Sequence, residues 1–201
     1  MNCLKTVLLC ASAAAIFGVA HDQVTVRICT EYFTIAHPPL FPTRSPTIVA
    51  LCWGVASTVW LGGAFGLVLH PVVNSSGAPP VVLSRLLRLL ATLLSATAAS
   101  ALLTGLLAFH LSRSGVLPVP VALDSLLPAS RHNNFMAVWF AHMTSYFIAI
   151  AGGALIVHRL WRERGRPVVP PLLPQTRSGV LRVALLAISA ATVLYFRLRG
   201  R

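Results

Sequence analysis

The sequence predicts an all-α integral membrane protein, a bundle of four to five transmembrane helices. Of its 201 residues 56% are apolar and 10% are charged, and its mean hydropathy of +0.79 is too high for a soluble domain that covers its core with polar surface. Long uncharged runs approach the ~20 residues that cross a bilayer. Arg, Pro or polar clusters bound these runs, as is typical of transmembrane helix ends.

The N-terminal part of the chain permits two interpretations. Residues 1–20 contain Lys5, an apolar run and small residues, which is the pattern of a signal peptide and also of a first transmembrane anchor. Residues 21–46 follow as an outer loop. Within it the alternating run Val24-Thr25-Val26-Arg27-Ile28 is the pattern of a short strand.

The remaining chain is predicted to form the transmembrane helical bundle, residues 47–196, with spans at about 47–69, 86–109, 135–157 and 180–196. Asp and Glu are absent from the first three of these spans, which weighs against ion coupling through carboxylates. The span 180–196 contains Arg182 and precedes the basic tail 197–201, so it either crosses the membrane or lies in the interface.

Charge and composition predict the location. Sixteen basic and four acidic residues give a net charge of +12, and their separation by membrane-length runs makes them a topology signal rather than a nucleic-acid patch. The expected partners are the lipid bilayer and other membrane-protein subunits, with no nucleic acid. The run Arg159–Arg166 is expected on the cytoplasmic side. Fifteen Arg to one Lys, with much Ala, favours a GC-rich bacterium and its inner (cytoplasmic) membrane.

Small residues recur every four positions in two of the predicted spans, which places them on one helical stripe in each. Such stripes allow close approach of helix backbones. Packing within the bundle is expected, with homodimerisation as the alternative. The predicted helix-packing residues are Gly54, Thr58, Gly62, Gly66, Ala141, Ser145, Ala149 and Gly153.

The candidate ligand-binding residues are those that the predicted topology brings to the outer side of the membrane. His142 lies about two turns into its span, with Ser145 and Tyr146 three and four positions further on. A buried His is a candidate for ligand binding or proton handling, and otherwise bonds to a neighbouring helix. The full candidate set is Glu31, Tyr32, His37, Arg131, His132, His142, Ser145 and Tyr146.

Cofactor hypotheses depend on the same histidines. Axial haem ligation would need facing pairs, for which His110 with His142 and His70 with His158 are topologically possible. A metal site from Glu31, His37, His132 and His142 has suitable ligand types but no recognised spacing. Cys29 and Cys52 both fall toward the outer side and form one possible disulfide. No motif assigns a catalytic residue, and the cofactor, if any, is left open.

Several short motifs resemble an uncharacterised family of small bacterial multi-span inner-membrane proteins. They are Glu31-Tyr-Phe-Thr with His37-Pro38, Trp53-Gly54, Arg131-His132, Ala141-His142 and Ser145-Tyr146. The resemblance implies only a bacterial inner-membrane bundle and transfers no catalytic residue. The sequence thus favours a non-enzymatic membrane subunit or scaffold with an outer aromatic and His site. A His-dependent haem- or metal-binding redox subunit and a small transporter are the alternatives.

Overall fold

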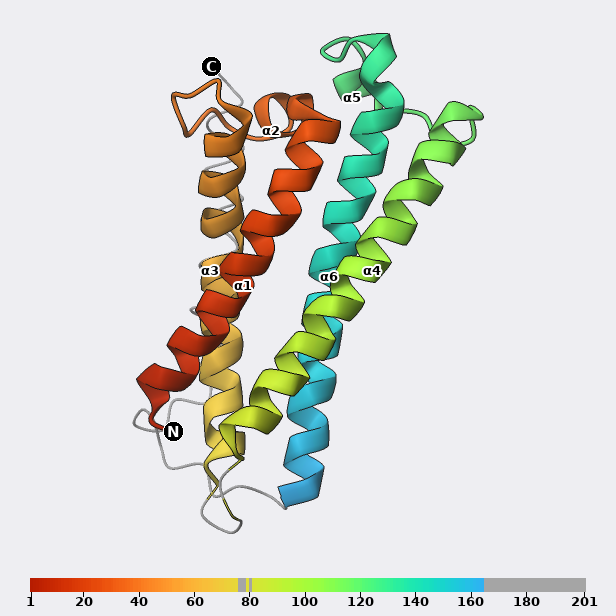
Figure 1. Ribbon diagram of the computed structural model, residues 1–201. Helices are drawn as coiled ribbons and strands as arrows, with labels where there is room; N and C mark the ends of the chain where they lie inside the picture. The colour runs from red at the N-terminus through yellow and green to blue at the C-terminus, as the bar shows by residue number, and fades with distance from the viewer. Residues whose placement is uncertain (76–78, 80, 165–201) are drawn as a thin grey trace. The chain divides into compact units, whose positions relative to one another are not determined.

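The chain folds into long helices joined by loops and short helical segments (Figure 1). The structure is a computed structural model that describes residues 1–75, 79 and 81–164. No strand occurs among these residues. The long helices are α1 (Cys3–Ile28), α3 (Pro46–Val73), α4 (Leu83–Arg113) and α6 (His132–Arg164), and the short segments are α2 (Thr30–Ile35), α5 (Val121–Asp124) and η1 (Ala129–Arg131).

Four described helices are long and apolar enough to cross a membrane. They contain 26 to 33 residues, and at 1.5 Å per residue even the shortest exceeds the ~30 Å hydrocarbon core. The protein is therefore a multi-pass membrane protein with an all-α helical bundle. The predicted span 180–196 and the tail 197–201 lie outside the described residues.

The first helix is longer than the sequence pattern indicates. Its start is capped by Asn2, whose side-chain oxygen accepts from the Lys5 backbone N–H, and it runs without interruption to Ile28. The strand expected at 24–28 is wrong, because these residues form the last turns of α1. Continuing the helix satisfies every backbone group within one segment, whereas an isolated strand would leave its edges unpaired beside lipid. The connection between α1 and α3 therefore begins at Cys29.

The four long helices form two pairs, α1 with α3 and α4 with α6. Glycines on α3 allow α1 to approach closely: a Cβ on Gly54 would lie 2.6 Å from the Val19 Cα, and one on Gly62 would lie 2.5 Å from the Cys10 carbonyl oxygen. Gly66 meets the Val7 backbone in the same way. The stripe of small residues on α3 thus faces α1.

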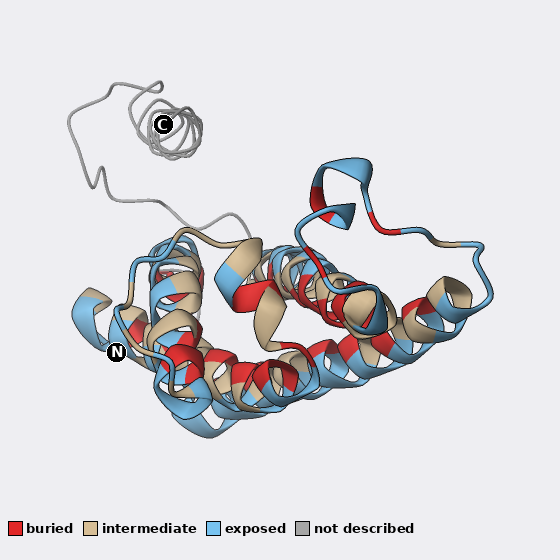
Figure 2. Cartoon of the chain, turned by 90° about the horizontal axis from the view of Figure 1, so that it is seen from above, coloured by how far each residue is buried: buried red, intermediate tan, exposed pale blue. Residues whose placement is uncertain are grey.

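The small residues of α6 face more than one neighbour. Ala141 approaches Gly105 of α4, where an added Cβ would lie 3.4 Å from the Ala141 Cβ. Gly153 instead faces the Phe65 ring of α3, at 3.1 Å from its added Cβ, and Ala149 borders a small cavity between the helix pairs. Seen from above, buried residues lie mainly on helix sides that face one another (Figure 2).

Two apolar clusters lie at opposite ends of the bundle. One joins the end of α1, the start of α3 and the start of α6, and includes Val26, Val49 and Phe135. The other joins the end of α3, the start of α4 and the end of α6, and includes Leu69 and Leu86. The polar cluster described next lies beside the first of these, between the two helix pairs.

Candidate functional site

The centre of the candidate site is a buried contact between Asp22 of α1 and His142 of α6. Asp22 Oδ1 lies 3.1 Å from His142 Nε2, and the two side chains are 6% and 7% exposed. Asp22 is six residues, or about 9 Å of helix, from the end of α1, so the contact lies within the helical bundle. Ionisable groups at membrane depth are costly and are commonly functional.

The hydrogen bond of the second ring nitrogen of His142, Nδ1, shows where the protons of this contact lie. Nδ1 lies 2.8 Å from the Val138 carbonyl oxygen, and because a carbonyl only accepts, Nδ1 carries a hydrogen and donates it. Nε2 and the Asp22 carboxyl share a further proton, since two bare acceptors at 3.1 Å would repel each other. The pair is therefore neutral as a whole, with one proton between its two members.

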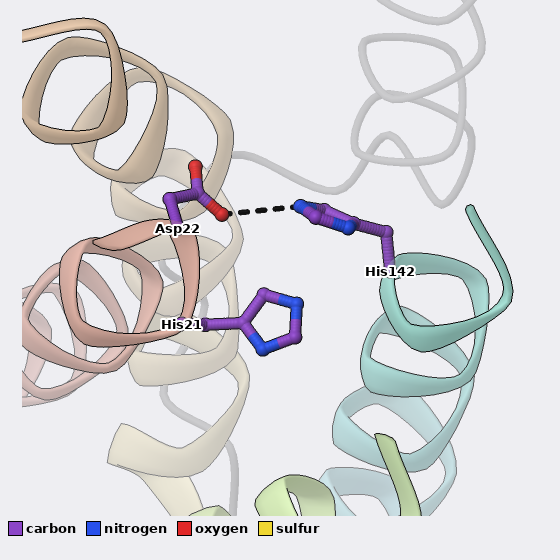
Figure 3. A group of neighbouring side chains, drawn as sticks. All are labelled: His21, Asp22 and His142. Carbon is purple, nitrogen blue, oxygen red and sulfur yellow. Dashed lines mark hydrogen bonds and ion pairs between the residues drawn. The ribbon is translucent and has the colours of Figure 1, made fainter. Parts of the chain in front are cut away.

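His21 brings a second imidazole to this pair. Its ring meets the His142 ring edge-on, with the centroids 4.6 Å apart. Figure 3 shows the His21 ring extending from α1 beside the Asp22–His142 contact. His21 Nε2 is buried, and among the described residues no hydrogen-bond partner reaches it. One donor atom from each of His21, Asp22 and His142 lies within 4.8 Å of the other two.

These three side chains are of the types that bind a divalent transition-metal ion. Two imidazoles and a carboxylate are a common ligand set for such ions, and two atoms 3.1 Å apart can each lie about 2.1 Å from one ion. His142 is oriented as metal-binding histidines commonly are, with its other N–H donated to the Val138 carbonyl. His21 Nε2 would be the third ligand.

Aromatic side chains from α2 cover His142. The ring centroids of Tyr32 and Phe33 lie 4.5 and 5.6 Å from that of His142, and both residues are buried. Burial raises the pKa of the Tyr32 phenol above its usual value, so this hydroxyl stays neutral at physiological pH. The aromatic layer separates the polar cluster from the surface at this end of the molecule.

Polar contacts hold α2 in place. Glu31 accepts a hydrogen bond from Arg131 Nε at 2.9 Å, and the Cys29 thiol donates to its other oxygen at 3.3 Å. Partial burial opposes ionisation of Glu31, but the hydrogen bonds from Arg131 and Cys29 outweigh it and lower the pKa of this carboxyl. The side chain of Asn134 also donates to the Ile28 carbonyl at 3.1 Å. The start of α6 thus anchors the turn between α1 and α2.

His37 closes the aromatic layer from the loop after α2. Its Nδ1–H donates to the Tyr32 carbonyl at 2.9 Å, and its ring centroid lies 4.7 Å from that of Trp53. Burial lowers the pKa of His37, which favours the neutral imidazole. His37 therefore supports Tyr32 rather than entering the polar cluster.

The other sequence candidates are distributed around this centre. Ser145 donates to the His142 carbonyl at 2.8 Å, and Tyr146 lines the small cavity between the helix pairs. Glu31 and Arg131 form the ion pair at the rim.

His132 lies apart from the cluster. Its Nε2 contacts the Leu127 carbonyl at 3.2 Å, and its Nδ1 lies 3.7 Å from Asp124. The structure does not bring Glu31, His37 and His132 together with His142: among the described residues, the group of possible metal ligands that contains His142 consists of His21, Asp22 and His142.

Sequence reasoning missed His21 and Asp22, which lie next to each other at the assumed boundary between leader and loop. The available signal was an adjacent His and Asp directly after an apolar run. Had that run been extended as a helix to Ile28, both would have been ionisable groups at membrane depth, which are functional candidates by default.

The structure also gives the surroundings of the histidines and cysteines for which haem ligation and a disulfide were expected. Both nitrogens of His142 have partners, and His110 packs against the neighbouring Phe109 ring. At the opposite end, His70 Nδ1 lies 3.4 Å from Thr6 Oγ1, and the His158 ring lies beside Trp161. These contacts are with residues other than the expected partner histidines, and haem ligation stays a prediction. The disulfide expected between Cys29 and Cys52 is also wrong, because both are free thiols.

Comparison of the chain with protein-family models, with curated proteins and with solved structures gave no match. The resemblance to a bacterial inner-membrane family therefore stays a prediction.

Proposed function

We propose that this protein is a multi-pass membrane subunit that binds one divalent transition-metal ion through His21, Asp22 and His142. The observation that carries the proposal is the buried, unpartnered Nε2 of His21 beside the carboxylate–imidazole pair. A buried polar atom without a partner costs roughly 1–3 kcal/mol. Coordination would remove that cost and would replace the proton shared by Asp22 and His142. The aromatic and His site predicted on the outer side then serves as the cover of a metal centre.

We further propose where the protein lies and how it is oriented in the membrane. We place the protein in a bacterial inner membrane, with the α2 end outside and the Arg-rich end of α6 in the cytoplasm, because short inner loops and helix ends carry excess Arg and Lys. Leu40 and Val82 lie at opposite ends and are 58% and 62% exposed. In a background lacking the four native cysteines, an impermeant maleimide added to intact spheroplasts should label Leu40→Cys and not Val82→Cys. The reverse labelling would invert the orientation.

We also propose that residues 1–20 remain as a membrane anchor. The close contacts of Gly62 and Gly66 are made with Cys10 and Val7, and His21 directly continues the same helix. Removing this segment would leave α3 without its partner along most of its length. Intact mass of the purified protein should include residues 1–20, and a mass that begins near His21 would contradict this assignment.

Metal binding is tested by loading the detergent-purified protein with Zn²⁺ or Co²⁺ and measuring stoichiometry and affinity. We expect one ion per chain, and a loss of affinity of about 100-fold or more in His142→Ala and Asp22→Asn, because each removes a direct ligand. The matched control is His132→Ala, which removes a His from the same helix outside the cluster. Wild-type protein that binds no ion, or equal binding by Asp22→Asn, would refute the site.

Cation transport is a second candidate, favoured by the single proton held between Asp22 and His142 within the bundle. The carboxylate missing from the other spans is supplied here by α1. If the protein exchanges Zn²⁺ for a proton, a Zn²⁺ gradient should change the pH inside proteoliposomes. The Asp22→Asn variant should show no such pH change. A subunit that only binds metal would show stoichiometric binding without flux.

A further inference from the structure

An apolar cavity of about 470 Å³ borders the proposed metal centre. It lies between α1, α4 and α6, and its volume is within the 300–1,000 Å³ range typical of small-molecule pockets. Its walls are formed mainly by aliphatic and aromatic side chains, among them Phe17, Val24, Leu102 and Phe109. Such a lining suits an apolar chain rather than a polar metabolite.

The cavity and the cluster share a wall. His21 lines the cavity, and so do Val138 and Ala141, which lie four and one positions before His142 on α6. Two other polar residues line it, but Thr25 donates to the His21 carbonyl and Asn134 donates to the Ile28 carbonyl. His21 is therefore the polar wall residue whose ring nitrogen lacks a partner. A molecule in the cavity that carries one polar end would meet the cluster there.

Charge determines which polar end is suitable. A divalent ion held by one carboxylate and two neutral imidazoles leaves a net charge of +1, and an uncompensated charge in a low-dielectric interior is costly. Every other carboxylate among the described residues is already close to a cation or a His: Glu31 to Arg131, Asp124 to His132, and Glu163 to Arg85 and Arg159. Three protein ligands also leave a coordination position open.

Resting on the metal site proposed above, we propose that the cavity binds a fatty-acid-like carboxylate. Its apolar chain fills the space between α1, α4 and α6, and its carboxylate reaches the open position on the metal and neutralises the remaining charge. The ligand would enter from the bilayer, where such amphiphiles dissolve. This assigns the lateral cavity and the metal centre to one binding site with two chemically distinct ends.

The test uses the full chain in phosphatidylcholine nanodiscs, loaded with Co²⁺ so that coordination is visible in the absorption spectrum. At pH 8, dodecanoate should change the Co²⁺ ligand-field bands, whereas dodecanol should not, because it lacks the anionic oxygens. Acetate should need at least a tenfold higher concentration than dodecanoate, because it has no chain to fill the cavity. An equal response to acetate, or no response to dodecanoate, would overturn the proposal.

Two variants separate the cavity from the metal. Ala98 and its neighbour Ala99 are both exposed, but only Ala98 lines the cavity. Ala98→Phe should weaken the dodecanoate response at least tenfold with Co²⁺ stoichiometry unchanged, and Ala99→Phe should behave as wild type. Equal responses of the two variants would reject the cavity. A wild-type protein that takes up no Co²⁺ would instead refute the metal site itself, which makes the two failures distinguishable.

Discussion

The Asp22–His142 pair has a protonation state that its neighbours impose. Because His142 Nδ1–H donates to the Val138 carbonyl, the remaining proton lies between Nε2 and the Asp22 carboxylate. In the proposed metal site, a bound cation replaces that proton. Metal binding at this pair should therefore depend on pH, because the ion and the proton compete for the same position.

Metal binding should release about one proton per ion, because the ion displaces the proton that Asp22 and His142 share. Calorimetry in buffers of different ionisation enthalpy should report about one proton released per ion. In Asp22→Asn the weakened binding should release less than this. Wild-type binding that releases no proton would show that the ion does not occupy this position.

The ion pair between Glu31 and Arg131 gives a second pH-dependent prediction. The pKa of Glu31 is lowered in the folded protein, so its contribution to stability is complete above the ordinary carboxyl value of 4.5 and is lost as the pH falls through the lower folded value. Because the pair is partly exposed, Glu31→Gln should cost less than about 1 kcal/mol at pH 7. The difference in melting temperature between the two proteins should narrow at pH 3, and a constant difference would contradict this account.

Single residues also show where sequence reasoning was sufficient. His142 was found because a His within an apolar span is conspicuous at any register. Its partners Asp22 and His21 were missed because they count as membrane-depth residues only if α1 continues past them. The alternating run at 24–28 is compatible with either a strand or a helix and does not show where α1 ends.

At the scale of the elements, the α1–α3 contact depends on the absence of side chains. A Cβ added to Gly62 would lie 2.5 Å from the Cys10 carbonyl oxygen. A Cβ added to the adjacent Gly63 would have Val7 Cγ1, at 3.9 Å, as its one neighbour within 4 Å. Lipid provides no hydrophobic drive between helices, so close backbone contact is what joins this pair.

Gly62→Leu should therefore lower the melting temperature in detergent by several degrees, or prevent folding, because its side chain must push α1 away. Gly63→Leu is the matched control, with the same change one position along the helix, and should melt close to wild type. Equal melting of the two variants would show that α1 does not pack along this stripe. The milder pair Gly62→Ala and Gly63→Ala applies the same test if the larger variant does not accumulate.

In the whole molecule, the candidate site joins the two helix pairs. Asp22 and His21 belong to the α1–α3 pair and His142 to the α4–α6 pair, and cavities lie between the pairs on either side of Phe17. A ligand bound here would therefore stabilise the association of the pairs rather than one helix.

Zn²⁺ at 100 times its dissociation constant should stabilise the folded protein by about 2.7 kcal/mol and raise its melting temperature. The His142→Ala protein should show no such increase, while His132→Ala should respond as wild type. A similar increase in all three proteins would indicate binding elsewhere on the molecule.

The sequence by itself determined the class of the protein, the approximate positions of the spans from 47 to 157 and the placement of His142 within a span, because hydropathy acts locally along the chain. Only the tertiary structure decided that 24–28 is helix, that His132 lies outside the cluster, and that His21 and Asp22 of α1 meet His142 of α6. The physical reason is that contacts between residues 120 positions apart depend on how the helix pairs pack, and a repeat of small residues identifies a packing face without identifying its partner.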